Sequence, residues 1–253
     1  MNIEIWTKRH FTKDSTIDWP CPNCKRNSLQ ILKEQFWNGQ TAESKKMREE
    51  EEFWDIEWIN LVFSGVLICS NCSEHITFTG KGNPEPQGFY DYELDQMHHQ
   101  YVEEFVPTFF EPSLNIFEIP EKCPDSVTDE IKNSFKLFWS DLPASANRIR
   151  TSLEVLLNEH KVKRFEINGG KRKPISLHKR ILIFDNKELT DLLMAIKWIG
   201  NTGSHLGDLQ TIDILEAYKM FEFALNKIYN NQEIEIKKIT KEINKRKGTR
   251  KRK

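Results

Sequence analysis

Four of the five cysteines occur as two pairs with two residues between the partners, Cys21-Pro-Asn-Cys24 and Cys69-Ser-Asn-Cys72. This spacing allows one tight turn to direct both thiolates of a pair at a single ion, and two such turns complete a tetrahedral shell of four sulfurs. Such a shell leaves no open position for a substrate. The pattern therefore predicts one structural Zn²⁺ per chain, bound by Cys21, Cys24, Cys69 and Cys72, with Cys123 outside the site.

Two other uses of paired cysteines fit the sequence less well. A disulfide framework accompanies a secretory signal, but the chain begins Met-Asn-Ile-Glu-Ile-Trp-Thr-Lys, without an apolar core before a small-residue cleavage site. A thioredoxin-like redox motif would occur once, whereas the Cys-x-x-Cys motif occurs twice here. We therefore favour the structural zinc site.

The segments around the cysteine pairs predict a small β domain. Leu29–Trp37 and Trp58–Ile68 are rich in β-branched, aromatic and aliphatic residues, and His75–Thr79 follows the second pair as a third short strand. A hairpin made of the first two strands would return the second cysteine pair to the first. We predict a zinc ribbon with a long hairpin insertion over residues 1–83.

Residues 84–123 differ in composition from the segments on either side. Six of the ten prolines lie between Pro84 and Pro124, among many aromatic residues, so this stretch is not one long helix. It is also too aromatic for a disordered linker. We predict an ordered connecting strap that crosses both domains, with a short helix over Tyr92–Phe105.

From residue 124 onward, apolar residues recur at helical spacing. The predicted helices run from Asp125 or Ser126 to about Trp139, from Asp141 or Pro143 to about His160, over Leu177–Ile183 and Lys187–Ile199, and from Thr211 to about Tyr229. This succession of helices favours an antiparallel bundle over residues 124–232. The predicted fold class is α+β, with a small N-terminal β zinc ribbon followed by this α-helical bundle.

The net charge of −1 conceals an uneven distribution. Residues 237–253 contain ten Lys or Arg and one acid, so they carry about +9 and residues 1–236 about −10. Residues 233–253 therefore form a basic C-terminal tail, which is either a phosphate-binding segment or a solubilising terminus. Its basic clusters also match a nuclear-import pattern, but such clusters are common in Lys-rich chains, so we favour the first two interpretations. The candidate nucleic-acid-binding residues are Lys245, Arg246, Lys247, Arg250, Lys251, Arg252 and Lys253.

No apolar run reaches membrane-spanning length, so we expect a soluble, cytoplasmic protein without membrane contact.

One group of polar residues in the predicted bundle stands apart from ordinary packing. Arg150 and Glu154 lie beside the apolar stripe of one helix, and Gly200-Asn201-Thr-Gly-Ser-His205 ends another. These side chains fit a buried hydrogen-bonded network that fixes the helix register. They also fit a catalytic site with His205 as general acid or base and Arg150 as the group that stabilises phosphoryl charge. The spacing alone favours the first interpretation.

The two Cys-x-x-Cys pairs, the string Arg-Ile-Arg150-Thr-Ser-Leu-Glu154 and the string Gly200-Asn201-x-x-x-His205 together resemble the family known as domain of unknown function 4145. The resemblance covers about Pro120 to Asn231, and it implies an N-terminal ribbon and a setting in bacterial defence beside restriction-type endonucleases. The helical part is also similar to HEPN bundles, many of which are dimeric, metal-independent ribonucleases. Their motif places a catalytic Arg where this chain has Gly200, which removes the charge that would hold a phosphate.

Three functions follow as hypotheses. The leading one is a defence-associated zinc-ribbon and HEPN-like module that binds nucleic acid or a partner effector without catalysis. The second is a HEPN-type, metal-independent ribonuclease that uses His205, together with Asn201 and a cation such as Arg150 or Lys197, across a dimer interface. The third is a structural subunit that dimerises. The expected partners are nucleic acid at the basic tail, a protein of the defence system and a second copy of the chain.

Overall fold

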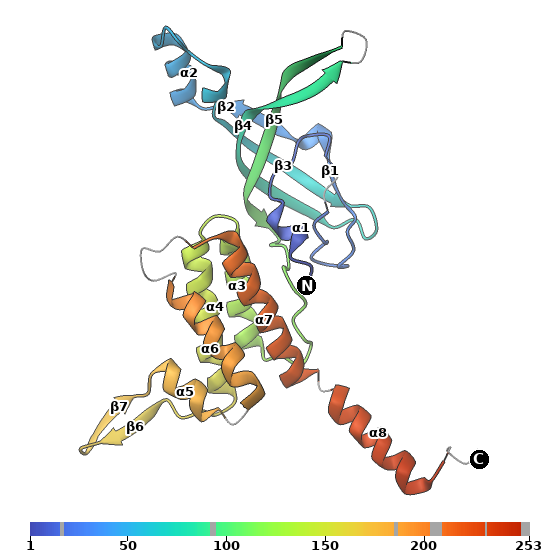
Figure 1. Cartoon of the computed structure of the whole chain (residues 1–253), viewed down its shortest axis with the longest axis vertical. Helices are drawn as coiled ribbons and strands as arrows, with labels where there is room; N and C mark the ends of the chain where they lie inside the picture. Colours follow the sequence, from blue (N-terminus) through green and yellow to red (C-terminus); the bar gives the residue numbers. More distant parts are fainter. Residues whose placement is uncertain (16–17, 92–94, 185–186, 203–208, 231, 249–253) are drawn as a thin grey trace.

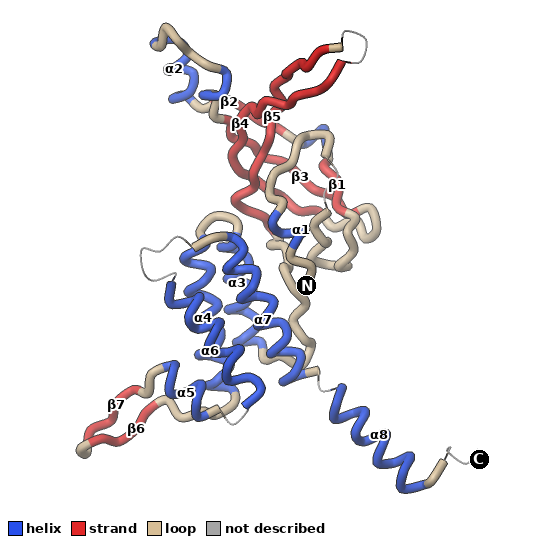
Figure 2. The backbone as a smooth tube through the Cα atoms, viewed as in Figure 1, coloured by secondary structure: helices blue, strands red, loops and turns tan. Residues whose placement is uncertain are grey.

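The computed structural model has an N-terminal part built around a curled antiparallel sheet and a C-terminal part built from helices (Figure 1). It describes all residues except 16–17, 92–94, 185–186, 203–208, 231 and 249–253. Figure 2 shows that the long strands are confined to the N-terminal part, while one short hairpin projects from the helical part. The predicted α+β class is confirmed at this level.

The N-terminal sheet has the strand order β1-β3-β4-β5, and β2 also pairs with β3. Its strands are β1 (Leu29–Ile31), β2 (Trp37–Gln40), β3 (Leu61–Cys69), β4 (His75–Asp91) and β5 (Gln96–Glu111). The short helix α1 (Glu4–Thr7) precedes the sheet, and α2 (Ala42–Glu50) and two 3₁₀ turns (Lys33–Gln35 and Ile56–Trp58) lie in the connections before β3.

The strands β4 and β5 are far longer than the sequence suggested. Residues 84–111, predicted as part of a connecting strap, form most of the β4–β5 hairpin, and the predicted helix over Tyr92–Phe105 is wrong because Gln96–Phe105 lie in β5. The prolines fit this arrangement because β3 pairs with β4 only as far as Gly82. Beyond Gly82, β4 pairs with β5 along one edge only, and its other edge has no partner strand in the described part of the chain. Pro84 and Pro86 are tolerated in this region because a strand with one free edge does not need an amide N–H at every position.

An aromatic core fills the curled sheet. Its rings belong to Phe11, Phe36, Phe63, Phe78 and Phe105, with centroids 5.1–6.1 Å apart. Gly80 allows this close packing, because a Cβ at this position would lie 2.2 Å from the carbonyl oxygen of Val106. The register between β4 and β5 also shifts between Thr79 and Gly80, which adds a local bend to the sheet.

The helices of the C-terminal part are α3 (Asp125–Phe138), α4 (Leu142–Glu159), α5 (Leu177–Ile183), α6 (Lys187–Thr202), α7 (Thr211–Tyr229) and α8 (Gln232–Arg246), and β6 (Phe165–Asn168) and β7 (Lys171–Pro174) form the short hairpin between α4 and α5. The helices α3, α4, α6 and α7 pack side by side (Figure 1). The predicted helices from α3 to α7 are confirmed to within a few residues. Side-chain caps at Asp141, Ser176 and Gln210 explain why three of them begin where they do.

The two parts of the chain meet at Trp139, the residue that follows α3. Its ring packs against Trp6, Trp19 and Phe110 of the N-terminal part, with centroid distances of 6.2, 5.1 and 4.7 Å. The guanidinium of Arg9 donates a hydrogen bond to the Trp139 carbonyl oxygen and lies 5.3 Å from the ring centroid. The sheet and the helices therefore share one continuous aromatic contact.

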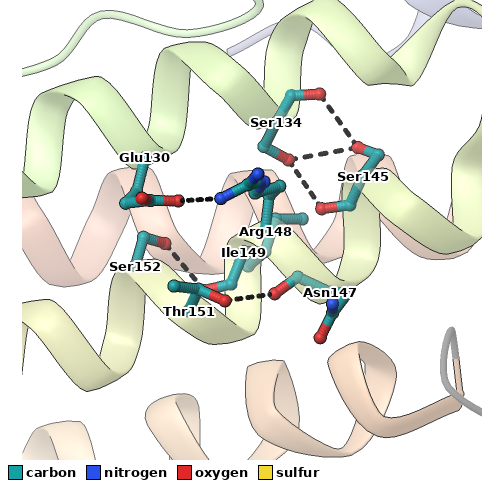
Figure 3. A network of polar contacts seen from close by, with 8 residues as sticks. All are labelled: Glu130, Ser134, Ser145, Asn147, Arg148, Ile149, Thr151 and Ser152. Carbon is teal, nitrogen blue, oxygen red and sulfur yellow. Dashed lines mark hydrogen bonds and ion pairs between the residues drawn. The ribbon is translucent and has the colours of Figure 1, made fainter.

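A buried hydroxyl network joins three helices at the centre of the bundle. The Tyr218 hydroxyl on α7 lies 2.8 Å from Ser134 Oγ on α3 and 2.9 Å from Ser145 Oγ on α4. The two serines also donate to each other's carbonyl oxygens, and Figure 3 shows this pair beside the ion pair between Arg148 and Glu130. Burial raises the pKa of the Tyr218 phenol well above its usual range.

Among the described residues, no helix combines the length and the apolar character that crossing a membrane requires.

Replacing Tyr218 with Phe should reduce the free energy of unfolding by about 1 kcal/mol, because the two serines keep their carbonyl partners but lose one buried hydroxyl partner. Urea denaturation of the variant and the wild type measures the difference. The matched control is Tyr229→Phe on the same helix, whose hydroxyl is only partly buried, and we expect a smaller loss there. Equal losses in the two variants would show that the network is not a specific feature of the core.

Candidate metal centre and polar residues of the bundle

Two turns of similar backbone structure carry the four cysteines. In the first turn, the amide of Lys25 donates to the Cys21 carbonyl oxygen at 2.9 Å, and in the second the amide of Ser73 donates to the Cys69 carbonyl oxygen at 2.9 Å. Lys25 and Ser73, each directly after the second cysteine of its pair, have φ angles of 64° and 59°. These left-handed residues close both turns and bring the paired thiols to the same side.

The four sulfur atoms converge on one point. Cys21 Sγ lies 3.7 Å from Cys72 Sγ, Cys24 Sγ lies 3.6 Å from Cys69 Sγ, and all four sulfurs lie within 4.8 Å of one another. In a tetrahedral shell with metal–sulfur bonds of about 2.3 Å, the sulfurs would be about 3.8 Å apart. The spacing therefore fits a single metal ion, and it is much too long for disulfide bonds, which need about 2.05 Å.

Hydrogen bonds prepare part of the cluster for the thiolate form. Burial opposes ionisation of Cys69, but the Ser28 hydroxyl at 3.0 Å and the backbone amides of Cys72 and Asn71 lower its pKa to about 6. The backbone amide of Arg26 likewise lowers the pKa of Cys24. Burial raises the pKa of Cys21 to about 12. A bound cation would favour the thiolate at all four positions, because metal ligation requires deprotonated cysteines.

The fifth cysteine stands apart from this cluster. Cys123 lies in the segment before α3, and its side chain is buried. Burial raises its pKa, so it stays a protonated thiol at neutral pH. Among the described residues, Cys21, Cys24, Cys69 and Cys72 form the one group of cysteine, histidine or acidic side chains close enough to hold a metal ion.

The polar residues predicted in the bundle are only partly brought together. Arg150 Nη2 on α4 lies 3.1 Å from Glu154 Oε1 one turn later, and both side chains are partly exposed. Asn201 lies half-buried in the last turn of α6. His205 lies outside the described residues, so the structure does not place it relative to Arg150 or Asn201. Among these four residues, the Arg150–Glu154 pair is the one ion pair or hydrogen bond between side chains in the part of the chain that the structure describes.

At Gly200, α6 packs tightly against α4. A Cβ at Gly200 would lie 2.6 Å from Arg150 Cβ and 3.1 Å from the Ala146 carbonyl oxygen. Both atoms are part of or directly attached to the α4 backbone, so they cannot move aside without moving that helix. Close packing of these two helices therefore explains why position 200 carries no larger residue.

Lys197 is a cation in an unusual environment. Its side chain is 4% exposed, and its ammonium lies 3.3 Å from His178 Nδ1 and 3.2 Å from the centroid of the Trp198 ring. Burial lowers its pKa, and the positive charge of Arg150 lowers it further. Arg150 also has a buried Nε without a hydrogen-bond partner among the described residues. Two cations from α4 and α6 are thus held near each other at the edge of the bundle.

The predicted basic tail is helical over much of its length. Gln232–Arg246 form α8, and Lys245 and Arg246 are exposed in its last turn, followed by exposed Lys247. Arg250, Lys251, Arg252 and Lys253 lie outside the described residues. Ile236, Ile239 and Ile243 lie on one side of this helix at helical spacing. This spacing indicates a helix, and the prediction of a tail missed it because that prediction considered only the charged residues.

The sequence reasoning missed a second basic surface. The β6–β7 hairpin and the residues at its base carry seven exposed cations, Lys161, Lys163, Arg164, Lys171, Arg172, Lys173 and Lys179. The signal was present as Asn168-Gly169-Gly170, a turn sequence typical of a hairpin, with Lys or Arg on both sides.

The purified chain should contain one metal ion, measured by elemental analysis after gel filtration in reducing buffer. Cys69→Ser should lower the metal content to near zero and reduce thermal stability, because the loss of one thiolate opens the shell. Cys123→Ser is the matched control, since it removes a buried cysteine outside the cluster, and it should retain the metal. A wild-type chain that stays metal-free after incubation with excess ion would contradict the assignment.

Replacing Gly200 with Ala should lower the free energy of unfolding by about 1–3 kcal/mol, because the added methyl group overlaps with α4. Chemical denaturation measures the change. Thr202→Ala, two residues later at an exposed position of the same helix, serves as the comparison and should be close to neutral. If Gly200→Ala were as stable as the wild type, close packing would not explain the glycine.

Two parts of the chain match known families. Residues 9–110 match the family described as Domain of unknown function (DUF8608), and residues 132–246 match the one described as Domain of unknown function (DUF4145). No curated protein and no solved structure matches the chain. The second match confirms the family resemblance inferred from sequence and extends it to the end of α8. The helical part of the chain is therefore similar to DUF4145 from within α3 to Arg246, and the sheet is similar to DUF8608.

Proposed function

We propose that the protein is a zinc-stabilised binding module of a bacterial defence system, which contacts nucleic acid and does not cleave it. The match of residues 132–246 to DUF4145 supports the resemblance from which we take the defence setting. In this proposal the β part is a zinc ribbon with an extended β4–β5 hairpin, and the helical part is a HEPN-like scaffold. The compartment we propose is the cytoplasm.

The donor set supports zinc as the metal. Four cysteine sulfurs with spacings of 3.6 and 3.7 Å across the cluster suit Zn²⁺, which binds thiolates in a tetrahedron without preference for another geometry. Cys21, Cys24, Cys69 and Cys72 would hold the ion, and its charge would stabilise their thiolate forms. A shell of four protein ligands supplies structural stability and offers no position for a substrate.

The observation that carries the binding proposal is α8. This helix extends away from the packed helices (Figure 1), and Lys238, Lys241, Lys245 and Arg246 are all exposed on it. The acidic remainder of the chain repels a polyanion, so a projecting basic helix provides a contact that keeps phosphates away from the acidic surface. The basic residues beyond α8 extend the same charge.

The packing at Gly200 supports binding without catalysis. The Arg of the HEPN motif would hold the scissile phosphate, and the distance of 2.6 Å between a Cβ at this position and Arg150 Cβ leaves no space for it. The cation that the motif provides for phosphate is therefore missing from its usual place.

The full-length, metal-loaded protein should retain a labelled nucleic acid at 50 mM salt and release it as the salt concentration rises. A chain that ends at Ile236 should bind at least ten times more weakly, and the slope of log affinity against log salt should become shallower by about 3 or more, because at least four phosphate contacts are lost. Fluorescence anisotropy over a salt series measures both. Unchanged affinity in the truncated chain would refute the role of the basic C-terminal segment.

A metal-independent ribonuclease is the second candidate, favoured by the buried Lys197 ammonium beside Arg150 and His178. In this proposal Lys197 replaces the missing Arg one helical turn earlier, and His205 is the general acid or base. Incubation of the metal-loaded protein with total RNA, in chelator-free buffer at low salt without added divalent metal, tests it. Cleavage by the wild type that is lost in both Lys197→Gln and His205→Ala would establish the nuclease and overturn the non-catalytic proposal.

A dimerising structural subunit is the third candidate. Ile236, Ile239 and Ile243 are 61, 50 and 41% exposed, and they form an apolar stripe on α8 that a second copy of the helix would cover. Light scattering after gel filtration distinguishes a dimer from a monomer. A dimer without affinity for nucleic acid would favour this candidate over the other two.

A further inference from the structure

The β6–β7 hairpin projects from the bundle without contributing to its core. Figure 1 shows it extending from the end of the bundle at which α4 finishes and α5 begins, and all eight residues of its two strands are exposed. An isolated two-stranded hairpin has little stability of its own, so a hairpin with both faces in solvent is not explained by packing.

The charge of the hairpin is almost entirely positive. Residues 161–180 contain eight Lys or Arg and one acid, Glu166, and every one of these cations except Arg180 is exposed. Glu166 Oε1 lies 3.5 Å from Lys179 Nζ, so the one negative charge already faces a cation. The remaining cations have no acidic partner within salt-bridge distance among the described residues. Such a surface suits a polyanion.

The base of the hairpin is fixed to the bundle. The Ile175 amide donates to the Arg164 carbonyl oxygen at 2.8 Å and closes the strands just beyond their last pair. Arg180, buried in α5, donates to Asn158 Oδ1 on α4 at 2.7 Å. Asn158 lies next to the end of α4, where the chain leaves the bundle, and Arg180 lies in α5, where it returns. This hydrogen bond therefore joins the two ends of the segment that carries the hairpin. The cations are therefore presented on a supported projection.

The two faces of the hairpin carry different side chains. Residues opposite each other in the register share a face, so Phe165 and Ile167 lie with Arg172 on one face and Lys171 and Lys173 lie on the other. The Arg172 guanidinium lies 3.8 Å from the Phe165 ring centroid, and Ile167 is 82% exposed. One face can contact phosphates, and the other presents a supported guanidinium and an apolar side chain.

The tip of the hairpin is narrow. Gly169 and Gly170 form the turn with φ angles of 58° and 72°, and neither position has a neighbouring atom within 4 Å of where a Cβ would be. Two consecutive residues with positive φ are typical of the turn that matches the twist of paired strands. Four residues per strand extend roughly 13 Å. A major groove of B-form DNA is about 12 Å wide and 8.5 Å deep, and it admits a two-stranded ribbon.

We propose that the β6–β7 hairpin enters the major groove of duplex DNA, with Lys171 and Lys173 on the phosphates and Arg172 directed at base edges. This inference rests on the proposed function and names its ligand. B-form DNA fits the projection better than an RNA duplex, because the major groove of A-form RNA is too narrow for side chains to read. The basic C-terminal segment then provides a second, less specific phosphate contact.

The test uses the full-length, metal-loaded chain and a variant in which Lys171, Arg172 and Lys173 are all replaced by Gln. Because these residues are exposed and outside the core, the variant should fold with the thermal stability of the wild type. Its affinity for a labelled 20-base-pair DNA duplex should fall at least tenfold, and its slope of log affinity against log salt should be shallower by about 2, because the phosphate contacts of Lys171 and Lys173 are lost.

The matched control replaces Lys45, Lys46 and Arg48 by Gln. These residues are exposed on α2, which lies at the far end of the molecule from the hairpin (Figure 1), and the change removes the same charge. This control should bind like the wild type. If it loses as much affinity as the hairpin variant, only the net charge matters and the inference is overturned.

The remaining outcomes separate the two proposals. A wild type that binds DNA while the hairpin variant binds equally well overturns the hairpin assignment and leaves the proposed function intact. A wild type that binds no nucleic acid at low salt overturns both. Equal affinity for single strands or for an RNA duplex of the same sequence overturns the choice of ligand, and equal competition by polyglutamate would assign the hairpin to an acidic protein partner.

Discussion

The convergence of the four cysteine sulfurs is the constraint on which the N-terminal part depends. Between α1 and β1 the described chain forms turns and single bridges instead of long strands, yet Phe11 and Trp19 from this stretch are buried. The first cysteine turn ends this stretch, and the second lies in the connection between β3 and β4. An ion held between them would fix the stretch against the sheet, and Trp19 from this stretch contacts Trp139 at the junction with the helices. Metal binding by these sulfurs would therefore stabilise one of the segments that join the sheet to the bundle.

The fold could be predicted from sequence where local signals agree with the tertiary environment. The helices from α3 to α7 have apolar stripes of helical period, and several begin at a residue that caps them, so both signals place the same boundaries. The β4–β5 hairpin could not be predicted in this way. In sequence, Pro84 and Pro86 argue against a central strand. They can lie in β4 because β3 pairs with β4 only as far as Gly82, so both prolines lie where β4 has one partner strand.

The candidate site was predictable only where chemistry requires a fixed spacing. The cysteine ligands follow from two short motifs, but the hydrogen bond from Ser28 to Cys69 depends on how the loop before β1 folds. The glycine at position 200 is explained by its short distance to Arg150 on another helix, which no local sequence pattern records. The basic hairpin had a local turn signal, but its exposure on both faces is a property of the assembled bundle.

The separation between hairpin and core has an evolutionary consequence. A substitution in β6 or β7 changes the surface of the molecule without creating a cavity, and an insertion at Gly169–Gly170 lengthens the projection without moving α4 or α5, which Arg180 and Asn158 join at the base. Selection can therefore alter the length and charge of this element while the bundle keeps its packing. Among proteins that share the bundle, we expect this hairpin to diverge faster than the helices that carry it, as recognition loops diverge on the scaffolds that present them.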